Sequence, residues 1–251
     1  MLGTGNLSPR RIGRLAGIVQ LGEAITAGVA QVAILSGLVV TGDPSATAQN
    51  ILVHETFLWV GFALSLIGVA LHVACAVLYD ALLRPVNQVL SRLAASILLI
   101  GCAVQALMAL FYIAPLVALR TGSGSAGISN AQTQTIAYIL VKLNGQAFDL
   151  HLFFFGLWCF LVGILIYRSG FLPRILGFLL SVAGVGWATF LVPPFGHLIF
   201  VAVAVASAAG EIPIELWLII KSVGLNGLRS GSAVPDPEEL REGPLHAERS
   251  H

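Results

Sequence analysis

Six ionisable side chains interrupt the long apolar stretches of this chain and are its best candidates for chemistry: Glu23, His72, Asp149, His151, Glu211 and Glu215. A charged side chain at the centre of a membrane helix costs about 2.5–3.5 kcal/mol on insertion scales, so such groups normally face the interior of a helix bundle. Carboxyl and imidazole groups in that setting exchange protons or bind metal ions. Their spacing decides which of these roles they can share.

Glu211 and Glu215 are four residues apart, so they share one face of a helix. Pro213 lies between them and cannot donate a backbone hydrogen bond, which predicts a kink. Counting along the apolar stretches places Glu23 at the depth of Glu211. We therefore expect Glu23, Glu211 and Glu215 to form a substrate or proton site between the first and last helices. The alternative is that Glu215 extends to the lipid headgroups and Glu211 bonds to a neighbouring helix.

His72 and Cys75 are three residues apart and share a helix face, while Asp149 and His151 supply two further groups that could bind a metal ion. The spacing matches no specific metal motif, and a single histidine in a helix bundle also serves as a hydrogen-bonded structural residue. We therefore predict no cofactor. A metal or haem held by His72, Asp149 and His151 is the alternative.

The elements that position these groups are membrane helices. Hydrophobic residues make up 57% of the 251 residues and charged residues only 10%, far from the usual soluble balance of about a quarter charged. Crossing the hydrocarbon core takes about 20 apolar residues as a helix. The sequence predicts an all-α bundle of six transmembrane helices in residues 1–222, with spans at about 12–41, 56–83, 86–119, 145–167, 172–191 and 197–221.

Charges between the predicted spans indicate the orientation. Of the 13 Lys and Arg residues, only Arg120 and Lys142 fall on one side. The others share the opposite side: Arg10, Arg11, Arg14, Arg84, Arg92, Arg168, Arg174, Lys221, Arg229, Arg241 and Arg249. Basic loops remain cytoplasmic, so both termini are predicted to be cytoplasmic. Residues 223–251, rich in Gly, Ser, Pro and mixed charge, are expected to be a disordered cytoplasmic tail.

Two features of the first span concern its processing and packing. The apolar stretch that follows Arg10 and Arg11 is longer than the 7–15-residue apolar region of a cleavable signal, so it is interpreted as an uncleaved span. Gly13 and Gly17 form a GxxxG pair, which would let another helix approach closely as part of ordinary helix packing.

Several local motifs carry a family resemblance. They are the segments 8–17, 82–87, 153–157 and 167–177 and the Gly210-Glu211 step, of which the segment 167–177 is the most specific. With these motifs the chain resembles, over about residues 8–222, the bacterial membrane family called domain of unknown function 4386. The resemblance implies a multi-pass protein of about six helices in the plasma (inner) membrane of a prokaryote. It implies no activity and no catalytic residues.

Two functional hypotheses follow. The first is a non-enzymatic membrane protein that binds or moves a small molecule or protons through an inter-helical polar pocket near Glu23 and Glu211. The alternative is an intramembrane metal-dependent enzyme, similar to a hydrolase, with Glu211 as general base. A third possibility is a purely structural or assembly role. The lipid bilayer is the expected partner, oligomerisation is left open, and a net charge of +1 gives no basis for binding nucleic acid.

Overall fold

The computed structural model describes residues 8–122 and 127–221, and within these ranges the chain is helical without strands. Six helices are long and apolar enough to cross a membrane, which confirms the predicted fold class. The predicted tail lies outside the described residues. The elements are α1 (Pro9–Gly28), the π-helix η2 (Val29–Leu35), α2 (Ser36–Leu38), α3 (Pro44–Val53), α4 (Glu55–Leu83), α5 (Gln88–Gly122), α6 (Asn130–Ser169), α7 (Arg174–Ala188), the 3₁₀ helix η3 (Thr189–Leu191), α8 (Pro193–Leu198) and α9 (Phe200–Ile220).

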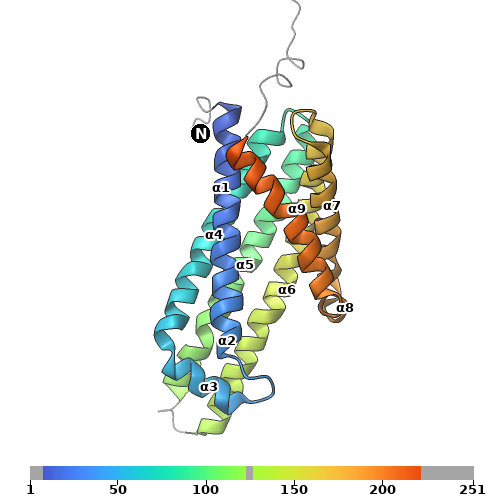
Figure 1. Cartoon of the computed structure of the whole chain (residues 1–251). Helices are drawn as coiled ribbons and strands as arrows, with labels where there is room; N and C mark the ends of the chain where they lie inside the picture. The colour runs from blue at the N-terminus through green and yellow to red at the C-terminus, as the bar shows by residue number, and fades with distance from the viewer. Residues whose placement is uncertain (1–7, 123–126, 222–251) are drawn as a thin grey trace, which may run out of the picture.

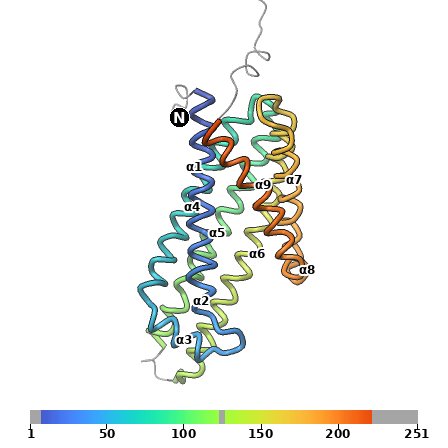
Figure 2. The backbone as a smooth tube through the Cα atoms, viewed as in Figure 1, coloured from blue at the N-terminus to red at the C-terminus, as the bar shows by residue number. Residues whose placement is uncertain are grey.

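The six long helices form a closed ring. Each packs against the next in the order α1, α4, α5, α6, α7 and α9, and α9 returns to pack against α1. Figure 1 shows the start of α1 and the end of α9 at one end of the bundle, called here the terminal end. The tube in Figure 2 shows α2, α3, the end of α5 and the start of α6 at the opposite end, called here the α3 end. The interior of the ring is thus surrounded by all six spans.

The first span contains an unpredicted π-helical segment, η2. In a π-helix the backbone N–H bonds to the carbonyl five residues earlier, and the N–H of Ser36 makes this bond to the carbonyl of Gln31. Side chains stabilise the wide turn as well. The Ser36 hydroxyl donates to the Gln31 carbonyl at 2.8 Å, and the Tyr112 hydroxyl of α5 donates to the Ala30 carbonyl at 2.8 Å. The apolar pattern of the first span does not predict this segment, because the segment depends in part on the Tyr112 hydroxyl of another helix.

Glycine allows α6 and α7 to pack with their backbones in contact. Gly156 faces Gly184 and Gly163 faces Gly177, and the two glycines on each helix are seven residues apart. A Cβ atom at Gly163 would lie 2.6 Å from the carbonyl oxygen of Gly177, a distance that real Cβ atoms do not tolerate. Small residues at such spacing let membrane helices approach closely. This contact fixes the position of α7 on the bundle.

The predicted close approach at Gly17 is also present. A Cβ at Gly17 would lie 2.8 Å from the carbonyl oxygen of Glu215, so the first helix packs on the backbone of α9 at this point. The contact closes the ring, and it sets the depth of Glu215 relative to the polar residues that follow Gly17 on α1.

Candidate functional site

Polar side chains from four helices meet at the centre of the ring and form what we call the central cluster: Glu23 of α1, His72 of α4, Gln105 of α5 and His151 of α6. Gln105 Nε2 donates to Glu23 Oε1 at 3.1 Å. His72 Nδ1 lies 3.1 Å from Glu23 Oε1 and 3.1 Å from Gln105 Oε1. The exposed fraction of each of the four residues is 6% or less. The membrane interior therefore contains a connected carboxyl, imidazole and carboxamide group.

The hydrogen bonds assign the tautomer of both histidines. His72 Nδ1 faces two oxygen acceptors, so it carries the hydrogen, and in the neutral ring Nε2 is then an acceptor. That Nε2 atom is buried and has no hydrogen-bond partner. His151 Nδ1 lies 3.1 Å from the Gly101 carbonyl oxygen, which can only accept, so it too carries the hydrogen. The two rings are neighbours, with centroids 5.2 Å apart. The cluster therefore has an unused proton acceptor beside a carboxyl group.

Further buried amides extend the polar region along the first span. Toward the terminal end, the Tyr79 hydroxyl donates to Gln20 Oε1. Toward the α3 end, Gln31 Nε2 donates to Asn144 Oδ1 at 2.9 Å, and Asn144 Nδ2 donates to the Met108 carbonyl at 2.8 Å. The site residues predicted from the sequence are all ionisable, so they include neither these amides nor Gln105. Amide residues within apolar spans are a signal that would have found them.

Glu211 and Glu215 lie at a different place from the central cluster. They line a groove of about 290 Å³ between α1 and α9, here the α1–α9 groove, together with Ser207, while Leu21, Ala24 and Ile25 contribute from α1. Trp187 Nε1 of α7 donates to Glu211 Oε1 at 2.8 Å. Glu215 is 2% exposed, and its Oε2 atom has no partner. α9 continues as one helix through Pro213.

The predicted sharing of one site by Glu23 and Glu211 stays a prediction. Glu23 occupies the same stretch of α1 as the groove-lining residues Leu21 and Ala24, which agrees with a common depth. Its carboxyl group, however, contacts Gln105 and His72 rather than α9. The Glu23 carboxyl group is therefore directed toward α4 and α5, whereas Glu211 bonds to Trp187 of α7.

The three proposed metal ligands are not gathered at one point. The rings of His72 and His151 are adjacent, but Asp149 contacts another residue, because His197 Nε2 of α8 lies 3.0 Å from its Oδ2 atom. Asp149 and His151 are two residues apart on a helix and so point to different faces. Cys75 is buried and free. Among the residues that the structure describes, no group of three His, Cys, Asp or Glu side chains is placed to hold a metal ion.

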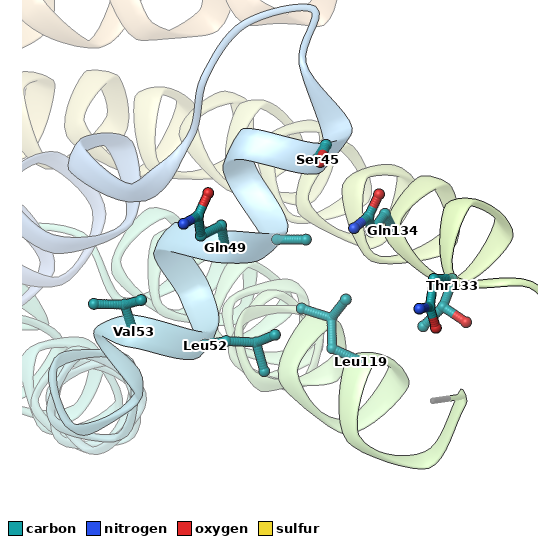
Figure 3. A pocket seen from close by; sticks show the side chains of 9 residues that line it. Ser45, Gln49, Leu52, Val53, Leu119, Thr133 and Gln134 are labelled. Carbon is teal, nitrogen blue, oxygen red and sulfur yellow. The ribbon is translucent and has the colours of Figure 1, made fainter. Parts of the chain in front are cut away.

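A separate pocket lies at the α3 end, between α3 and the facing ends of α5 and α6 (Figure 3). It measures about 390 Å³, and its polar lining consists of hydroxyl and amide side chains, including Gln49, Thr133 and Gln134. None of its lining residues is ionisable.

The fold and the buried polar cluster define a polytopic membrane protein with a polar interior. Residues 15–222 match the family described as domain of unknown function (DUF4386), so the chain belongs to this family. An uncharacterized protein of Archaeoglobus fulgidus is 36% identical over 75 residues, which cover 29% of this chain and 44% of the archaeal protein. The chain thus spans less than half the length of that relative. No solved structure matches the chain.

Proposed function

We propose that this protein binds protons at the central cluster and moves them through the helix bundle. The observation that carries the proposal is the contact of Glu23 with His72, whose Nε2 atom is buried without a partner. With an ionised carboxyl and a neutral imidazole, the pair has a net charge of −1, which is costly in a low-dielectric interior. One added proton makes the pair neutral overall, so the cluster is suited to take up a single proton.

Groups on both sides of the cluster offer a route for this proton. Glu211 and Glu215 of the α1–α9 groove lie toward the terminal end of α9, and Glu215 Oε2 has no partner. On the other side, Asp149 and His197 form a second carboxyl–imidazole pair. Chains of Asp, Glu and His inside a membrane are typical of proton relays. We assign Glu23 the central role and the other carboxyl groups the role of exchanging protons with either surface.

Replacing Glu23 with glutamine should abolish this proton movement, because the amide retains the size of the side chain but cannot take up the proton. The measurement is the decay of an imposed pH difference across liposomes that contain the purified protein, followed with a trapped pH-sensitive dye. Glu55→Gln is the matched control, since Glu55 pairs with Arg120 at the α3 end, outside the central cluster.

We expect the wild type and Glu55→Gln to dissipate the pH difference faster than empty liposomes, and Glu23→Gln to behave like empty liposomes. Infrared spectra recorded during a pH titration provide a second measurement. They should show a carboxylic acid band that is lost in Glu23→Gln and kept in Glu55→Gln. Equal proton decay for the wild type and Glu23→Gln, together with unchanged infrared bands, would contradict the proposal.

We also propose that the protein resides in the plasma membrane of a prokaryote with both termini in the cytoplasm. The support is the position of all but two of the basic residues on the side of the termini. Cysteine placed at Gln88, the first residue of α5, should react with a membrane-impermeant maleimide only after the cells are opened. Cysteine placed at Ser45 of α3 should react in intact cells. Both positions are exposed, and the three native cysteines are buried. Reversed labelling would show the opposite orientation.

A further inference from the structure

We infer that a cavity between η2 and α6 is a binding site for a small organic amine with an apolar substituent. This η2–α6 cavity measures about 570 Å³, and its walls come from η2, α2, α6, α8 and α9. Pockets that bind small molecules usually measure about 300–1,000 Å³ and combine apolar walls with a few converging polar groups. The cavity has both properties, and it is separate from the central cluster and from the α1–α9 groove.

The polar groups of the η2–α6 cavity select for a hydrogen-bond donor. The Asp149 carboxyl group lines it, is 3% exposed and makes one hydrogen bond, to His197. A carboxylate accepts up to about four hydrogen bonds, so one partner leaves most of its capacity unused. Gln31 also lines the cavity. Its Nε2 atom donates to Asn144 Oδ1 and Met108 Sδ, whereas its Oε1 atom is buried without a partner. The Asp149 carboxyl group and Gln31 Oε1 can therefore accept further hydrogen bonds. A protonated amine supplies several N–H donors and a charge opposite to that of the carboxylate.

Lys142 does not neutralise the Asp149 carboxylate. It precedes Asp149 by seven residues on α6, which corresponds to about 10 Å along the helix. Its ammonium group lies over the ring of Tyr138, with Nζ 5.2 Å from the ring centroid. The described ion pair of Asp149 is the one with His197. His197 Nε2 contacts only the Oδ2 atom, so the carboxyl group keeps acceptor capacity for a cationic ligand. The positive charge of Lys142, which also lines the cavity, disfavours ligands with a second positive charge.

The walls explain why the ligand should carry an apolar substituent. The apolar lining of the cavity consists mainly of Val32, Leu35, Val39, Val141, Phe148 and Phe200. The π-helical geometry belongs to this wall, since Gln31, Val32 and Leu35 all lie within η2. Single π-helical turns occur frequently at functional sites. An aromatic or short aliphatic amine would place its charge at Asp149 and its apolar part against these side chains.

Phenethylamine is the probe for this site, because it is soluble and combines one ammonium group with one phenyl ring. Its binding to the full-length protein in detergent micelles can be measured by equilibrium dialysis with radiolabelled amine. Phenethyl alcohol and phenylpropanoate serve as neutral and anionic competitors of similar shape. The test variants are Asp149→Asn, which removes the charge, and Val32→Trp, which enlarges a side chain of the cavity lining at a position that is 69% exposed.

We expect Asp149→Asn to weaken amine binding by about ten-fold or more, because the charged partner of the ammonium group is lost. Val32→Trp should also weaken it, and Glu55→Gln should leave it unchanged. Neither the alcohol nor the acid should compete. Equal binding to wild type and Asp149→Asn, or competition by the alcohol as strong as by unlabelled amine, would overturn the inference. Glu23→Gln should keep wild-type affinity for the amine, because Glu23 does not line this cavity. Amine binding and proton movement can therefore be lost independently, and the two proposals are tested separately.

Discussion

Replacing Gly163 with alanine should destabilise the bundle by about 3 kcal/mol, the upper end of the range for overpacking. The added methyl group would lie 2.6 Å from the Gly177 carbonyl oxygen and 2.7 Å from the Ser181 amide nitrogen, and backbone atoms cannot move aside as a flexible side chain does. Relief of the overlap requires α6 and α7 to separate along the contact that also includes Gly156 and Gly184. The loss should appear as a lower unfolding midpoint in detergent, followed by tryptophan fluorescence.

Gly145→Ala is the matched control for this substitution. Gly145 belongs to the same helix, but a Cβ at this position meets no atom within 4 Å. Alanine in an exposed helical position without a clash is expected to be neutral or to stabilise by about 0.4–1 kcal/mol. A comparable loss of stability for the two variants would show that the overlap at the α6–α7 contact does not govern the effect.

A second large effect is expected for Gly61→Ala in α4. The added methyl would lie 2.0 Å from the hydroxyl oxygen of Tyr112 and must displace this side chain. The displaced hydroxyl would lose its hydrogen bond to the Ala30 carbonyl in η2, and a buried carbonyl without a partner costs about 1–3 kcal/mol. The unfolding midpoint in detergent should therefore drop markedly relative to the wild type.

A double-mutant cycle separates the overlap from the lost hydrogen bond. Tyr112→Phe alone should cost about 1 kcal/mol, because it removes the hydrogen bond and retains the ring. In the double variant the hydroxyl that overlaps the new methyl is absent, so Gly61→Ala should cost less in the Tyr112→Phe background than in the wild type. Strict additivity of the two changes would show that the two residues do not interact as described.

The spans were predictable because the bilayer imposes length and apolarity on each helix independently of its neighbours. The close approach of another helix to α1 was predictable at Gly17 for a similar reason, since glycine at helical spacing is a local signal, but the identity of that helix, α9, was not. The rotation of each helix was not visible, because nearly all side chains of a span are apolar. The contact of Glu23 with His72 and Gln105 depends on the relative rotations of three helices. A single sequence does not determine these rotations, so the contact could not be predicted.

The pairing of Asp149 with His197 was missed for a different reason. The predicted last span begins at His197, whereas this residue belongs to α8, a short helix that follows η3 and starts with Pro193 and Pro194. The prolines begin this helix because their fixed φ suits a first helical turn. The turn brings the imidazole to α6, and this tertiary contact has no counterpart in the spacing of the sequence.

The unequal lengths of the helices have a consequence for the surrounding membrane. α6 has 40 residues, whereas the span Arg174–Leu191 has 18, so the two extend about 60 Å and 27 Å. Figure 1 shows α8 well short of the α3 end. The hydrocarbon core is about 30 Å thick, so lipids beside α7 meet a shorter protein wall than lipids beside α5 and α6. Local thinning of the bilayer would relieve the resulting hydrophobic mismatch, so we expect this side of the molecule to prefer lipids with shorter acyl chains.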